Sequence, residues 1–126
     1  MIVLDADVVI EIERGNSKIV ESLADLRKAH PENPAITSAV YAEILYGFLV
    51  RNKQPPMELE SFEVIDFDKE SAEIFAQKKK FLDSKGTPIP IFDLITACCA
   101  ISRGALLVSL DKHYERVEGL NLLIVK

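Results

Sequence analysis

The chain begins with an uninterrupted apolar run, Ile2-Val3-Leu4, that stops at a carboxylate, Asp5. The run lacks the alternation of polar and apolar residues found in a half-exposed strand, so it indicates a strand covered on both faces, as in a parallel sheet. The carboxyl edge of such a sheet is where open α/β proteins bind ligands. Asp5 is therefore either a ligand-binding carboxylate at that edge or, like Asp7, simply a cap for the helix that follows.

Strand-like and helix-like segments alternate along the rest of the sequence. Strands are expected over residues 2–4, 35–37, 62–67, 105–109 and 122–125, and helices over 7–14, 17–30, 38–51, 68–84 and 92–104. Alternation of this kind with short connections predicts a parallel sheet between two layers of helices. We expect one α/β/α domain over residues 1–126, with a central, mainly parallel sheet of four to five strands.

Composition excludes several classes of protein. No apolar run approaches the roughly 20 residues of a membrane span, and the N-terminus lacks the basic segment of a secretory signal, so we expect a cytoplasmic protein without membrane contact. The two cysteines, Cys98 and Cys99, are adjacent and are expected to be free thiols in the core. The net charge of −5 argues against a binder of long duplex nucleic acid, unless clustered carboxylates account for it.

Most of the 20 acidic residues lie among other polar residues and need no special explanation. Four lie in apolar surroundings: Asp5, Glu43, Asp93 and Asp111. Asp5 and Asp111 each follow an apolar strand, and two parallel central strands would bring them to the same edge. Glu43 interrupts an apolar helix surface, and Asp93 lies in the first turn of a nearly all-apolar helix, where the helix dipole favours a carboxylate. This pattern predicts a crevice lined by carboxylates.

Carboxylates gathered in a partly buried crevice repel one another unless a cation lies among them. Oxygen ligands favour hard ions, so we expect Mg²⁺ or Mn²⁺. Such an ion activates water and stabilises the attacking and leaving oxygens of a phosphodiester, which predicts phosphodiester hydrolysis. The two histidines, His30 and His113, are expected to be surface or capping residues, although His113 can approach the crevice. A zinc site with several imidazoles is therefore not expected.

Four segments in order resemble the motifs of the PIN-domain family, and of its VapC-like toxin ribonucleases in particular. They are VLDADVVIE, TSAVYAEILYG, GTPIPIFDLITACCAISRG and LLVSLDKHYERVEGL. The resemblance extends over residues 2–125 and places the family's acids on Asp5, Glu43, Asp93 and Asp111, the four that apolar surroundings had selected. It implies a ribonuclease in which Asp5 and Asp93 are the main metal ligands. Asp111 would be a further direct or water-mediated ligand, and Glu43 a ligand or the residue that orients the attacking water.

The sequence departs from the family pattern in two places, at residues 6 and 7 and at residue 109. Ala6 and Asp7 stand where the family commonly has a hydroxyl residue followed by Asn or Ser, so one possible hydrogen bond is lost and one charge is added. Ser109 stands where Thr is usual, and it keeps a hydroxyl that can orient Asp111 or touch the substrate. All four acidic residues of the family pattern are present.

The resemblance also implies partners: an RNA substrate, a cognate antitoxin that covers the acidic crevice, and a second copy of the chain in a homodimer. The apolar residues Tyr41, Tyr46, Phe48 and Leu49 fit a dimer or partner contact, or an ordinary core. Substrate choice is expected to involve the basic residues Arg14, Arg51, Lys53, Lys112 and Arg116. The alternatives are a non-catalytic module of the same fold that binds RNA or protein, and a metal-dependent phosphatase or phospho-acceptor domain of similar topology.

Overall fold

Five strands form one sheet in the order β3-β2-β1-β4-β5. The computed structural model describes residues 1–125, so Lys126, the last residue of the expected domain, lies outside the described residues. The strands are β1 (Ile2–Leu4), β2 (Ala35–Thr37), β3 (Glu63–Ile65), β4 (Leu106–Ser109) and β5 (Asn121–Ile124). The helices are α1 (Ala6–Glu13), α2 (Ser17–Ala29), α3 (Ser38–Val50), α4 (Lys69–Ser84) and α5 (Ile91–Ser102), with the short 3₁₀ helices η1 (Met57–Ser61) and η2 (Lys112–Arg116).

All four strand pairings are parallel, and β1 lies in the middle of the sheet between β2 and β4. This confirms the expectation from Ile2-Val3-Leu4 of a central strand covered on both faces. Leu4 pairs with Val108, so the chain leaves β1 and β4 at the same edge. That edge is the carboxyl end of every strand.

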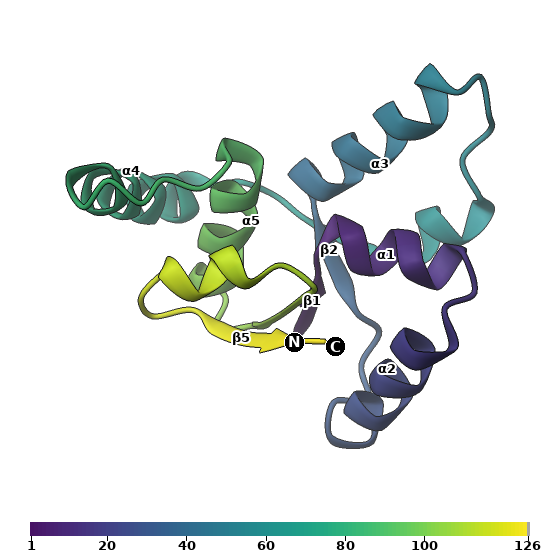
Figure 1. Cartoon of the computed structure of the whole chain (residues 1–126). Helices are drawn as coiled ribbons and strands as arrows, with labels where there is room; N and C mark the ends of the chain where they lie inside the picture. Colours follow the sequence, from purple (N-terminus) through teal and green to yellow (C-terminus); the bar gives the residue numbers. More distant parts are fainter. Residues whose placement is uncertain (126) are drawn as a thin grey trace.

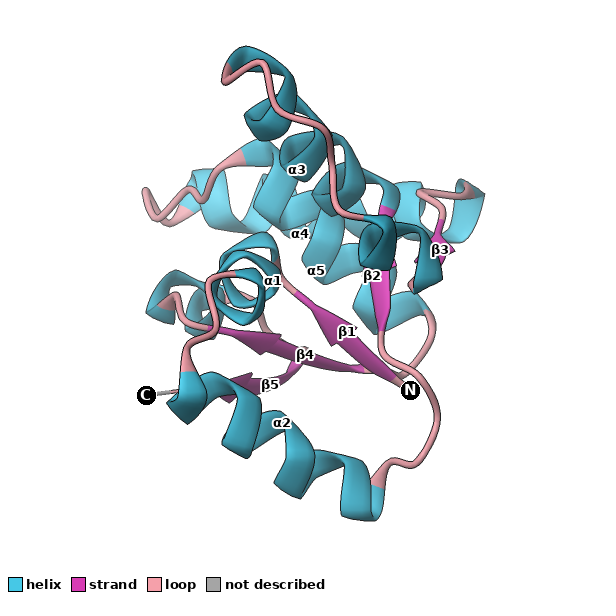
Figure 2. Cartoon of the chain, turned by 90° about the vertical axis from the view of Figure 1, so that its right-hand side faces the viewer, coloured by secondary structure: helices cyan, strands magenta, loops and turns pink. Residues whose placement is uncertain are grey.

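Helices cover both faces of the sheet, with α4 and α5 on one side of the strands and α1, α2 and α3 on the other (Figure 1). Alternate residues of β1 supply the two cores: Val3 packs on the α4–α5 side, and Ile2 and Leu4 pack on the side of α1–α3. Figure 2 shows β1, β4 and β5 side by side. In this view α1 is drawn above the strands and α2 below them, although both helices pack on the same face of the sheet. The predicted α/β/α sandwich is confirmed.

Helix α5 is the most buried helix, as its apolar sequence predicted. Its residues 94 and 96–100 are buried, including the free thiols of Cys98 and Cys99. Burial raises the pKa of the Cys98 thiol to about 12, as expected for an inert core residue. The hydroxyls of Thr37 and Thr96 lie 2.8 Å apart and connect the end of β2 to α5. No helix among residues 1–125 is long and apolar enough to cross a bilayer.

The differences from the predicted elements are local. Strand β3 covers only 63–65 of the expected 62–67, and α5 begins one residue before Phe92. The 3₁₀ helices η1 and η2 were not predicted, because five mostly polar residues carry no apolar periodicity. Helix η2 contains His113 and Tyr114.

Candidate active site

The four predicted acids reach the carboxyl edge of the sheet from four elements. Asp5 directly follows β1, and Asp111 follows β4 after one intervening residue. Glu43 lies in the second turn of α3, and Asp93 lies in the first turn of α5. Electrostatic effects of Asp5 and Asp93 reach Glu43, and those of Asp5 and Asp111 reach Asp93, so the four carboxylates share one neighbourhood.

Asp5 is the buried member of this group, with 6% of its surface exposed. It occupies the N-cap position of α1, yet its side chain makes no capping hydrogen bond. Its Oδ2 instead accepts a hydrogen bond of 2.9 Å from the Ser109 hydroxyl on β4. The interpretation of Asp5 as a simple helix cap is therefore wrong, and its carboxylate is held at the sheet edge from a neighbouring strand.

Ser109 connects two of the predicted acids. It is fully buried, and its Oγ also accepts a hydrogen bond of 3.0 Å from the backbone N–H of Asp111. One hydroxyl thus fixes the Asp5 carboxylate and the backbone that leads to Asp111. The expectation that Ser109 could orient Asp111 agrees with this geometry.

His113, on η2, stands between the other two aspartates. Its Nε2 lies 2.9 Å from Asp93 Oδ2, and its Nδ1 lies 2.9 Å from Asp111 Oδ2. The Nε2 atom is buried and makes no well-directed hydrogen bond, so it touches Asp93 without hydrogen-bond geometry. Asp111 also accepts a hydrogen bond of 3.0 Å from the backbone N–H of His113. His113 thus approaches the crevice and is not a surface residue.

The acids of the cluster raise one another's pKa values. Burial, followed by the charges of Asp93 and Asp5, raises the pKa of Glu43 to about 6. Burial and the charge of Asp5 also raise the pKa of Asp93, and the neighbouring His113 opposes that rise. Raised values of this kind are common in active sites, and here burial is their largest cause, followed by repulsion between the acids.

Two further residues belong to this neighbourhood. Asp7 has a buried Oδ1 without a hydrogen-bond partner, and burial together with the charge of Asp5 raises the pKa of its carboxyl group to about 7. The sequence predicts for Asp7 a helix cap and an added charge, but not a place in this cluster. Tyr114 is fully buried, its hydroxyl has no well-directed partner, and burial with the nearby charges of Asp5 and Asp93 raises its pKa. No apolar pattern in the sequence singled out Tyr114.

The donor chemistry of the cluster fits a hard divalent cation. All of its acids offer oxygen ligands, and the raised pKa values of Asp7, Glu43 and Asp93 reflect burial and repulsion that a cation would relieve. Among residues 1–125, however, no three carboxylate, imidazole or thiol side chains already converge closely enough to hold an ion. Side chains of the cluster would therefore have to move toward a bound cation.

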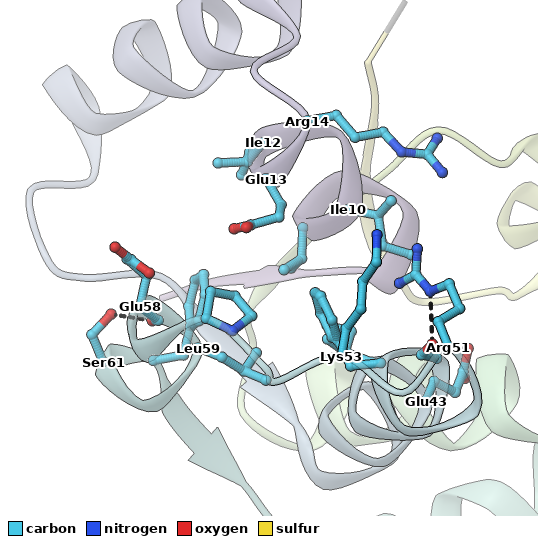
Figure 3. A pocket seen from close by; sticks show the side chains of 16 residues that line it. Ile10, Ile12, Glu13, Arg14, Glu43, Arg51, Lys53, Glu58, Leu59 and Ser61 are labelled. Atoms are coloured by element: carbon cyan, nitrogen blue, oxygen red, sulfur yellow. Dashed lines mark hydrogen bonds between the residues drawn. The ribbon is translucent and has the colours of Figure 1, made fainter.

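A groove of about 350 Å³ extends from Glu43 along α1 and α3 to η1 (Figure 3). Its apolar lining includes Ile12, Phe48, Leu59 and Phe62, and its basic residues are Arg14, Arg51 and Lys53. The Arg51 Nε donates a hydrogen bond of 2.8 Å to the Gly47 carbonyl. Three of the five basic residues predicted to influence substrate choice therefore line one groove that also reaches an acid of the cluster.

Comparisons with known proteins agree with the motifs. A sequence model of the PIN domain matches residues 2–120. The chain belongs to the PIN domain family. The resemblance drawn from the four sequence motifs is thereby confirmed, as is the PIN fold predicted with it. A comparison with curated proteins gave no significant match.

Several solved structures share this PIN fold over the full chain. VapBC2 from Rickettsia felis, solved with a DNA fragment from its promoter, is 27% identical with a TM-score of 0.81, and the match covers 100% of both chains. DNA-bound VapBC from Salmonella typhimurium is 24% identical with a TM-score of 0.78, covering 99% of this chain and 98% of that one. VapBC-1 from nontypeable Haemophilus influenzae is 22% identical with a TM-score of 0.78, covering 98% of each.

Proposed function

We propose that this PIN-domain protein is an endoribonuclease that depends on Mg²⁺ or Mn²⁺ and acts as the toxin of a toxin–antitoxin pair. The observation that carries the proposal is the gathering of Asp5, Glu43, Asp93 and Asp111 at the carboxyl edge of the sheet. Similarity to VapBC complexes supports the assignment to a toxin–antitoxin pair.

The acids divide into two roles in this proposal. Asp5 and Asp93 are the main metal ligands, with Asp111 as a further direct or water-mediated ligand. A bound divalent ion supplies positive charge for the phosphate and activates the attacking water. Glu43, with its pKa raised to about 6, is half ionised near that pH and mostly ionised at neutral pH, so it can orient the water and accept its proton. The water oxygen bonds to phosphorus, and one ester P–O bond breaks.

The basic residues of the groove support RNA as the substrate. Arg14 and Arg51 cap the C-termini of α1 and α3, and Figure 3 shows them with Lys53 around one end of the groove. Their charges would hold phosphates on a chain whose net charge is −5. A phosphate backbone lying in the groove would lead to Glu43.

The same groove also suits a segment of an antitoxin. Its apolar lining can bury the apolar face of a peptide, and Glu43 at its end can pair with a basic side chain of that peptide. Such a segment would exclude RNA from the acids. Inhibition would then follow from occupation of the path that the RNA substrate itself would take.

Helix α3 also offers a surface for homodimerisation. Tyr46, Leu49 and Val50 are exposed on it, whereas Tyr41 and Phe48 pack against the core. Of the four apolar residues that the sequence offered for a partner contact or a core, two are therefore exposed and two belong to the core. Contiguous apolar side chains exposed on one helix favour a protein–protein contact.

Incubation of the purified protein with structured RNA tests the proposal. Cleavage should require Mn²⁺ or Mg²⁺, stop with EDTA, and be lost in Asp5→Asn and Asp93→Asn variants that keep the wild-type fold by circular dichroism. Intact RNA that is nevertheless bound would favour the alternative, a non-catalytic module of the same fold. Cleavage that persists in EDTA would contradict the proposed metal dependence.

A further inference from the structure

The Asp93 and Asp111 oxygens that face His113 are already in contact with its ring. The 2.9 Å between Asp93 Oδ2 and His113 Nε2 leaves no room for an ion between them, because a Mg²⁺ ion needs about 2.1 Å to each ligand. A cation that approaches this oxygen from the side of His113 must displace the imidazole. The His113 ring therefore occupies one of the positions from which an ion could reach Asp93 Oδ2.

The contacts of His113 with the two aspartates are unequal. Asp111 holds the residue twice, since its Oδ1 accepts the backbone N–H of His113 and its Oδ2 contacts the ring Nδ1. Asp93 touches only Nε2. Neither ring contact is a well-directed hydrogen bond, so the backbone hydrogen bond to Asp111 is what makes the hold of Asp111 the stronger one. The weaker contact is the one that should break first, which leaves His113 with Asp111 on η2.

We infer that His113 is a positioning residue that competes with the divalent cation for Asp93 and remains anchored by Asp111. This inference rests on the proposed function, because it concerns how the acids of that site become available. It gives Asp111 a part beside that of a metal ligand, because its carboxylate holds His113 through the backbone N–H and lies against the ring Nδ1. Metal affinity is then set in part by the strength of the Asp93–His113 contact.

The inference is tested by titrating the purified protein with Mn²⁺ alone and measuring free Mn²⁺ by electron paramagnetic resonance. The variants are His113→Asn, which removes the ring, and His113→Phe, which keeps a ring to pack on Tyr114 at 4.7 Å between centroids. His30→Asn is the matched control, because His30 is the other histidine and lies at the end of α2. Asp93→Asn reports whether Mn²⁺ occupies the proposed site.

Both His113 variants should bind Mn²⁺ about two- to fivefold more tightly than the wild type, and the His30 variant should bind it equally. Weaker binding without His113 would make it a ligand and overturn the inference, and unchanged binding would overturn it as well. Either result leaves the nuclease proposal standing if Asp93→Asn still abolishes Mn²⁺ binding. Absence of Mn²⁺ binding to the wild type would overturn both.

In a second measurement, Mg²⁺ is added while the ring nitrogen resonances of the two histidines are followed by nuclear magnetic resonance. The His113 Nε2 resonance should shift on Mg²⁺ addition, since that atom loses its Asp93 contact. The Nδ1 resonance should move less, and His30 should not respond. Unchanged His113 ring resonances in a sample that binds Mg²⁺ would contradict displacement of the ring.

Discussion

The Ser109 hydroxyl donates a hydrogen bond to Asp5 Oδ2 across 2.9 Å and joins two strand ends that are 104 residues apart in sequence. It also accepts the N–H of Asp111, so a single buried oxygen organises two carboxylates of the cluster. The parallel pairing of β1 with β4 places these residues together. The geometry of the proposed site therefore depends on the register of the central sheet.

Replacing Ser109 with Ala should destabilise the protein. Asp5 loses its buried donor and the N–H of Asp111 loses its acceptor, so the free energy of unfolding should fall by about 1–2 kcal/mol. Urea unfolding at pH 7 measures this change. Ser109→Thr, which keeps the hydroxyl, should retain most of the stability, and an equal loss in both variants would show that side-chain volume is responsible.

Asp7 should make the stability depend on pH. Its pKa rises from 3.8 to about 7 on folding, so the folded state binds more protons, and stability falls as the pH rises from about 4 to 7. Asp7→Asn removes that penalty and should raise the free energy of unfolding by about 1–3 kcal/mol at pH 8, with little effect at pH 4. Thermal unfolding at the two pH values measures the difference.

The matched control for Asp7 is Glu21→Gln, which neutralises an exposed acid on α2. It should change the stability equally little at both pH values. A similar gain at pH 8 from Glu21→Gln would attribute the effect to net charge and not to burial of Asp7.

Arg51 should contribute to RNA binding separately from cleavage. In EDTA, Arg51→Ala should weaken binding to a single-stranded RNA about three- to tenfold and reduce the salt slope by about one phosphate contact. Fluorescence anisotropy at several salt concentrations measures both quantities. Lys80→Ala, on the exposed surface of α4, is expected to change neither, and an equal loss there would indicate nonspecific attraction.

The exposed apolar residues of α3 should hold two copies of the chain together. The wild type is expected to have twice the 14.1 kDa mass of the chain by light scattering. Leu49→Glu, at a position 66% exposed, should give the single-chain mass without loss of helix. Glu58→Gln on η1 provides a control away from that surface. A wild type of single-chain mass would refute the dimer.

The sequence predicted those parts of the site that follow from apolar patterning. Asp5 stood out because it ends an uninterrupted apolar strand, and Glu43 and Asp93 because carboxylates are unusual on apolar helices. Parallel pairing then required the residues after β1 and β4 to meet. These inferences depend on burial, which periodicity reveals.

The role of His113 could not be predicted in the same way. It depends on η2, a five-residue 3₁₀ turn without apolar periodicity, and on the distance from that turn to α5. Nor does any sequence pattern show that Asp7 would be half buried with an unpaired oxygen or that the Tyr114 hydroxyl would be buried beside the acids. Contacts between loops and helix ends decide these features.

The central claim is that a divalent ion binds among these carboxylates, and a crystal soaked in Mn²⁺ tests it most directly. We expect an anomalous peak within ligand distance of Asp5 and Asp93 oxygens, with the His113 ring withdrawn from Asp93. The peak should be absent from Asp93→Asn crystals soaked in the same way. No peak at the carboxyl edge of the sheet, or a peak only at a distant surface, would contradict the account.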